Sequence, residues 1–225
     1  MAQVAEYPNR SGLVDEAYAA IRARILDGRI PPGSRVTVRP LADKLDLSAT
    51  PIKGALVALE REGIISSRLH KGFFVPELGA DDMREIYDMR EALDVVSAER
   101  AAASVTATRA RKLLNFCAKQ EALIGAADID GYRELDLEFH RSLWALSGNS
   151  RIEKAGGSLL DQMRLGNALT ASRPGRAATA VTEHLAIAQA IAEQNVRVAG
   201  VAAKDHIRHA REAFEETLTS SEAGL

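Results

Sequence analysis

Hydrophobic positions divide the chain into a first third that mixes helices with short strands and a remainder that is helical throughout. In the first third, apolar residues recur every three or four positions in three segments, and two β-prone runs flank a short basic segment. The expected helices span residues 13–26, 40–45 and 50–62, and the expected strands span residues 36–38, 64–67 and 73–75. This order predicts a winged helix-turn-helix domain over residues 1–76.

The pattern changes after residue 76, and residues 77–80 are expected to form a linker. The six helices expected beyond it span residues 81–104, 106–126, 129–147, 150–170, 177–194 and 196–218. Short breaks separate them, which predicts an all-α antiparallel bundle over residues 81–220, followed by a tail at residues 221–225. Gly156 and Gly157 inside the fourth helix indicate a kink or a close approach of another helix. The predicted fold class is mainly α.

Composition sets a few broad limits. With 46% hydrophobic residues in 225, the chain can bury substantial cores. No apolar run approaches the ~20 residues that a membrane span needs, and the N-terminus lacks a signal pattern, so we expect a cytoplasmic protein without a membrane partner. The single cysteine, Cys117, cannot form an intramolecular disulfide and falls in a helical pattern where a small buried side chain is expected.

The net charge of -2 conceals a difference between the two parts of the chain. Residues 1–79 contain 11 Lys and Arg against 9 Asp and Glu, whereas residues 80–225 contain 18 against 22. Cations in the first part are a weak indication of nucleic-acid binding, because phosphate contact depends on where cations cluster. The third expected helix would fit the major groove, and the basic hairpin tip would touch the sugar-phosphate backbone or the minor groove.

Residues 25–34, 41–45, 48–56 and 59–65 resemble the DNA-binding domain of GntR-family bacterial transcription regulators, and the match covers nearly all of residues 13–76. The resemblance implies double-stranded operator DNA as a partner. The residues that it implies at the DNA are Arg39, Ser48, Thr50, Lys53, His70, Lys71 and Gly72. Ala49, Lys53 and Gly54 stand where the family usually has Arg, Arg and Glu, so the family's usual operator sequence is not expected. A protein-interaction module is the alternative for this domain.

Four residues of the helical part have the types and phases of a metal site. Asp136 and His140 lie one helical turn apart at the edge of an apolar stripe, and His184 and His206 fall on the inward faces of two later helices. His209 instead aligns with acidic residues and is expected to face solvent. Each histidine alone could be an ordinary hydrogen-bonded side chain, but together they predict a divalent transition metal site, with zinc preferred and nickel, iron or manganese as alternatives.

Residues 136–143, 148–149, 183–191 and 206–207 look like the FCD ligand-binding domain of the FadR subfamily in its metal-binding branch. The similarity runs from about residue 80 to 217, and the six-helix count favours the shorter, VanR-like form. In that branch the matching Asp and three His coordinate the metal. The resemblance thus implies the same four ligands that the helical phase selects.

Two arginines, Arg90 and Arg164, interrupt apolar stripes, and Asn167 lies one turn after Arg164. One interpretation is a salt bridge from each arginine to a neighbouring acid such as Glu91 or Asp161. The other is an anion site, because a divalent ion with one Asp and three neutral His carries a net positive charge. Arg90, Arg164 and Asn167 would then bind a small carboxylate effector, which agrees with the many FCD regulators that sense organic acids.

We therefore expect a homodimeric bacterial transcription regulator and not an enzyme. An effector acid would reposition the bundle helices and change the angle between the two DNA-binding domains of the dimer. A metal that is itself the signal, or purely structural, is an alternative. A metalloenzyme that uses the Asp and His residues is a more distant one, because Glu138 and Glu183 adjoin ligands in sequence and so point away from an open metal position.

Overall fold

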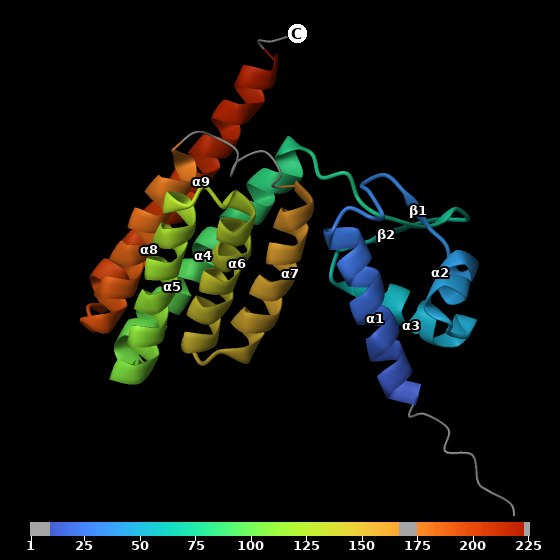
Figure 1. Ribbon diagram of the computed structural model, residues 1–225, viewed down its shortest axis with the longest axis horizontal. Coiled ribbons are helices and arrows are strands. Elements are labelled where there is room, and N and C mark those ends of the chain that lie inside the picture. The colour runs from blue at the N-terminus through green and yellow to red at the C-terminus, as the bar shows by residue number, and fades with distance from the viewer. Residues whose placement is uncertain (1–9, 167–174, 223–225) are drawn as a thin grey trace, which may run out of the picture. The chain divides into compact units, whose positions relative to one another are not determined.

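The computed structural model describes residues 10–166 and 175–222 (Figure 1). The chain divides into two compact units, of which the first ends at Glu77 and the second begins at Leu78. Among the described residues, no helix is both long and apolar enough to cross a membrane.

The first unit is a three-helix domain with a small antiparallel sheet. Its helices are α1 (Arg10–Leu26), α2 (Val38–Leu45) and α3 (Ala49–Arg61), and its strands are β1 (Arg35–Val36), β2 (Ser66–Arg68) and β3 (Gly72–Phe74). The strand order β1-β3-β2 places β3 in the middle, and β2 with β3 forms the hairpin. The predicted winged helix-turn-helix fold is confirmed.

Two boundaries of this unit differ from the expected ones. Strand β2 begins two residues later than predicted, because Ile64 and Ile65 are fully buried core residues that precede the ladder. Helix α2 begins at Val38, a residue expected at the end of a strand, so β1 is correspondingly shorter. Gly63 follows the end of α3 with φ +73, which lets the Ile64 amide donate a hydrogen bond back to the Leu59 carbonyl at 3.0 Å.

The second unit contains six described helices, as predicted, and no strand among its described residues. They are α4 (Ala80–Ser104), α5 (Ala107–Gly125), α6 (Ile129–Leu146), α7 (Ser150–Gly166), α8 (Arg176–Ala192) and α9 (Val196–Glu222). Helix α9 packs against α4 and α8, and α5 packs against α6 and α8. The end predicted for the fourth helix, residues 167–170, lies outside the described residues.

Small residues allow two of these helices to approach closely. Gly156 on α7 is buried, and a Cβ built there would overlap the ring of Trp144 on α6. A Cβ built at Gly157 would meet nothing within 4 Å. Because α7 is one continuous helix, Gly156 marks a close helix approach and not a kink.

Candidate metal centre

Three histidines from three helices meet inside the bundle. His140 on α6, His184 on α8 and His206 on α9 are 1%, 0% and 3% exposed. The Nε2 atom of His206 lies 3.3 Å from that of His184 and 3.3 Å from that of His140. The candidate ligand atoms of the three rings all lie within 4.8 Å of one another, so that one ion could contact all three.

Asp136 lies at the edge of this cluster, one turn before His140 on α6. Its Oδ1 atom is 3.6 Å from His184 Nε2 and accepts a hydrogen bond of 3.1 Å from the Tyr132 hydroxyl. The Asp136 side chain is 28% exposed, whereas the histidines are buried. The predicted carboxylate ligand therefore stands where the centre meets solvent.

The imidazole rings are held by packing from Phe139. This side chain is fully buried and stacks on His184, with ring centroids 4.1 Å apart and planes 21° apart. Phe139 also contacts the edge of His140 at 5.5 Å between centroids. The apolar stripe that α6 turns to the core thus orients two of the three imidazoles.

Each imidazole has a polar partner at its other nitrogen, and the sequence analysis identified none of these partners. Gln120 Oε1 lies 3.0 Å from His184 Nδ1, and Glu183 Oε2 lies 2.8 Å from His206 Nδ1. Asp94 Oδ2 is 3.1 Å from His140 Nδ1, a close electrostatic contact whose geometry falls short of a full hydrogen bond. Outer partners of this kind fix the ring orientation and tautomer of metal-binding histidines.

The donor set fits a divalent transition metal. Burial, and then the neighbouring charges of His206 and His140, hold the pKa of His184 well below its usual value. Burial also lowers the pKa of His206 to about 4, although the Glu183 carboxylate opposes the shift. Both rings are therefore neutral at pH 7, the form that binds metal. An acceptor that holds the proton on Nδ1 leaves a lone pair on Nε2, and a cation between the Nε2 atoms would offset the repulsion of such lone pairs.

Arg90 is buried beside the cluster and bonded to Asp94. Its Nη2 donates to Asp94 Oδ2 at 3.3 Å and its Nη1 lies 3.1 Å from Met163 Sδ, while Nε has no hydrogen-bond partner. Burial opposes ionisation of Asp94, but Arg90, His140 and the indole of Trp144 together lower the pKa of Asp94 to about 2. Arg90 therefore makes the salt bridge to a neighbouring acid that one interpretation predicted, but its partner is Asp94, one turn further along α4, and not Glu91.

The other two residues expected at the effector site are placed differently. Arg164 is 29% exposed, and its guanidinium pairs with Glu134 on α6 at 2.8 Å. Asn167 lies outside the described residues.

Cys117 is buried as expected, and burial raises the pKa of its thiol to about 12.

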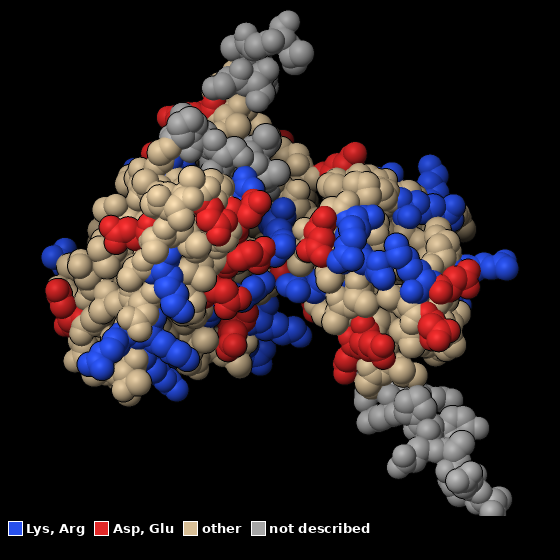
Figure 2. Space-filling model, in the orientation of Figure 1, with Lys and Arg blue, Asp and Glu red and all other residues tan. Residues whose placement is uncertain are grey.

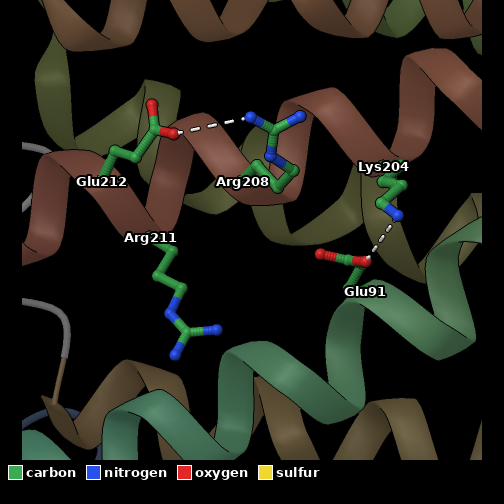
Figure 3. A pocket seen from close by; sticks show the side chains of 5 residues that line it. All are labelled: Glu91, Lys204, Arg208, Arg211 and Glu212. Atoms are coloured by element: carbon green, nitrogen blue, oxygen red, sulfur yellow. Dashed lines mark ion pairs between the residues drawn. The ribbon is translucent and has the colours of Figure 1, made fainter.

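A depression of about 490 Å³ on the outer surface of α4 and α9 is lined by five charged side chains (Figure 3). Lys204 lies 3.6 Å from Glu91, and Arg208 lies 3.8 Å from Glu212. Arg211 pairs with Asp88 at 2.6 Å. Because these cations already have acidic partners, the depression is a surface of paired charges and not the candidate effector site.

The seven residues expected at DNA are all exposed in the first unit. Ser48 and Thr50 lie at the start of α3 and Lys53 follows one turn later, which suits side chains that enter a major groove. His70 and Lys71 form the tip of the hairpin, where His70 has φ +60. Lys and Arg side chains gather on the visible face of this unit in Figure 2.

A winged helix-turn-helix is a DNA-binding fold, and in this chain an all-α bundle with an internal polar cluster follows it. The chain matches the family model for bacterial regulatory proteins of the gntR family over residues 13–75 and the model for the FCD domain over residues 85–209. The protein is therefore a GntR-family transcriptional regulator with an FCD domain.

Curated relatives carry corresponding names. The chain is 30% identical over 138 residues to an HTH-type regulator in the TAR-I ttuE-ttuC' intergenic region of Agrobacterium vitis, covering 60% of this chain and 81% of that one. It is 31% identical over 133 residues to the Nta operon transcriptional regulator of Aminobacter aminovorans, covering 59% and 63%. It is 26% identical to the HTH-type regulator YdhC of Bacillus subtilis over 89% of this chain and 90% of the relative.

Solved structures share the fold. McbR/YncC of E. coli superimposes with a TM-score of 0.77 at 18% identity, over 93% of this chain and 98% of that one. A GntR regulator from Rhodococcus sp. RHA1 gives a TM-score of 0.74 at 22% identity, over 92% and 97%. The family and the relatives are transcriptional regulators, in agreement with the expectation that the protein is not an enzyme.

Proposed function

We propose that the FCD domain of this regulator binds a divalent transition metal through His140, His184, His206 and Asp136, and that the metal helps to bind a small organic acid. The observation that carries the proposal is the convergence of three buried imidazoles on one point, with Nε2 atoms 3.3 Å apart in two of the pairs. Buried nitrogen lone pairs at this spacing repel one another unless a proton or a metal ion lies between them.

Three His and one Asp suit zinc best, and they also suit nickel, iron and manganese, so that the metal bound in the cell depends on availability. When bound, the ion would supply a Lewis-acidic position for an oxygen ligand. The chain's own residues do the rest: the outer partners hold the rings, and Asp136 stands at the solvent side, where a ligand would enter.

An acid is the effector class that the charges favour. With the metal bound, one divalent ion, three imidazole ligands and one carboxylate sum to a net charge of +1. The buried Arg90 guanidinium is close to this centre, because Arg90 and His140 both contact Asp94. Arg90 keeps one N–H without a partner, which a carboxylate oxygen could accept. Arg164 would join the site by exchanging its pairing with Glu134 for the acid.

DNA binding by the first unit is the response that the acid would modulate. Coupling requires that the acid bind two states of the protein with unequal affinity, and the reciprocal change then appears in DNA affinity. We propose a homodimer, because readers of this type bind two-fold operators with one unit on each half-site, and a cytoplasmic location, where operator DNA lies.

The experiment is a DNA-binding titration on an operator selected from random duplexes, with metal-loaded and chelator-treated protein and a panel of small carboxylic acids. We expect one class of acid to change the operator Kd only when the metal is bound. His140→Ala should lose both metal and acid response, whereas Arg197→Ala, a substitution of an exposed residue on α9, should keep them. Absence of DNA binding at low salt would contradict the proposal as a whole.

The depth of the cluster favours one alternative, a purely structural metal. A site whose three histidines are at most 3% exposed could stabilise the bundle without taking an exogenous ligand. Chelation separates the two functions: loss of thermal stability with an intact acid response would assign the metal a structural role, and loss of the response would support a role in acid binding. A change in operator affinity on metal addition alone would make the metal the signal.

A further inference from the structure

Glu183 joins three side chains where α8 meets α9. Its Oε2 atom accepts hydrogen bonds from His206 Nδ1 at 2.8 Å and from Arg176 Nη2 at 3.0 Å. Its Oε1 atom lies 2.8 Å from Nδ1 of His209. The Glu183 side chain is only 12% exposed, so this carboxylate is held from three directions.

The ionised Glu183 carboxylate can only accept hydrogen bonds, so it determines which nitrogen of His206 carries the proton. A neutral imidazole has one N–H, and a bond to Glu183 keeps it on Nδ1, so that Nε2 presents a lone pair. The competing form would carry the proton on Nε2, which lies 3.3 Å from the Nε2 atoms of both His140 and His184 and could donate to either. That form would block the position that a metal must occupy.

The other outer partners cannot make this choice as firmly. Gln120, beside His184, is an amide that can accept or donate according to the way it is turned, and its nitrogen has no hydrogen-bond partner. Asp94 Oδ2 lies 3.1 Å from His140 Nδ1, but the geometry of this contact falls short of a full hydrogen bond. Glu183 has the shortest of the three contacts to an imidazole nitrogen.

We propose that Glu183 is a positioning residue of the metal centre, which holds His206 in the Nδ1–H form so that its Nε2 faces the ion. This inference rests on the proposed metal function and deepens it. Because Glu183 adjoins His184 in α8, this helix supplies one ligand and supports another from α9. Metal affinity is thereby tied to the packing of α8 against α9.

Metal affinity tests the proposal through Glu183→Leu, which removes the acceptor, and Glu183→Gln, which keeps an acceptor oxygen without the charge. Competition with a chromophoric zinc chelator at pH 7 should give a loss of about 10- to 100-fold for Glu183→Leu and a smaller loss for Glu183→Gln. Glu193→Leu, at the exposed C-cap of α8, is the matched control and should bind zinc as the wild type does. An unchanged affinity in folded Glu183→Leu would overturn the proposal.

A second readout does not depend on metal. Long-range ¹H–¹⁵N NMR of the metal-free protein reports the tautomer of each histidine, and we expect His206 as Nδ1–H in the wild type and as Nε2–H in Glu183→Leu. If Glu183→Leu does not fold, the His206 tautomer of the wild type and the zinc affinity of Glu183→Gln still test the inference. A wild-type His206 with its proton on Nε2 would refute it. If the wild type binds no metal, the proposed function fails, whereas an Nδ1–H His206 would still support the tautomer role of Glu183.

Discussion

His184 and His206 present their Nε2 atoms to each other at 3.3 Å although both side chains are buried and each has an acceptor at Nδ1. Two neutral imidazoles held in this way would place two lone pairs face to face. Such a pair is unfavourable in a protein core unless a cation or a shared proton joins them. This relationship gives the metal site its most direct test.

Zinc should stabilise the wild-type protein against heat, because a ligand that binds only the folded state adds to the free energy of unfolding. At about 100 times the dissociation constant the gain is roughly 2.7 kcal/mol. Differential scanning fluorimetry with zinc and with a chelator measures it. His184→Ala should lose the zinc-dependent shift in melting temperature, and His70→Ala, which removes the exposed histidine of the first unit, should retain it. A full shift in His184→Ala would exclude this ion site.

Helical phase predicted which residues point inward, and it had a clear limit. It separated His206 from His209 and selected His184, because the apolar residues three and four positions away define the buried face of each helix. It did not identify Asp94 or Gln120, although both interrupt buried faces in the same way. Phase within one helix does not tell which neighbouring helix that face meets, so the pairing of outer partners with histidines required the packed bundle.

The strands illustrate the same limit in the first unit. Ile64 and Ile65 have the residue type of a strand, but the pattern could not distinguish a paired residue from a buried residue just before the ladder. The departure at Gly54 does have a visible packing context. A Cβ at this position on α3 would lie 3.2 Å from a methyl group of Val14 on α1, so the missing side chain fits a close contact of the two helices.

Asp94→Ala should be among the most destabilising single substitutions in the bundle. Asp94 is 1% exposed and contacts Arg90, His140 and Trp144, so its removal would leave the buried Arg90 charge without its carboxylate. Loss of one partner of a buried ion pair costs about 3–5 kcal/mol. Urea unfolding of metal-free protein measures the change.

Asp88→Ala is the matched control on the same helix. Asp88 pairs with Arg211 at 2.6 Å, but its side chain is 66% exposed, and surface ion pairs of this kind contribute less than about 1 kcal/mol. Equal losses for the two variants would mean that Asp94 does not carry the buried network ascribed to it.

The adjacent glycines of α7 should respond in opposite directions to alanine. Gly156→Ala forces a methyl group into the ring of Trp144, and overpacking of this kind costs roughly 1–3 kcal/mol. Gly157→Ala meets no atom within 4 Å and should gain about 0.5–1 kcal/mol from the better helix propensity of alanine. Urea unfolding of both variants provides the comparison. A neutral Gly156→Ala would show that α6 and α7 can separate at no cost.

Lys53 and Lys71 should each contribute to salt-dependent DNA binding from a different part of the first unit. Both are exposed, Lys53 on α3 and Lys71 at the hairpin tip. A lysine that neutralises one phosphate changes the slope of log K against log salt by about 0.9, so each alanine variant should bind more weakly with a slope shallower by about one. Fluorescence anisotropy on a selected operator between low and moderate salt measures both quantities. Lys112→Ala, at an exposed position of α5, is the control for a general loss of charge. Wild-type slopes in both the Lys53 and the Lys71 variant would remove these lysines from the DNA interface.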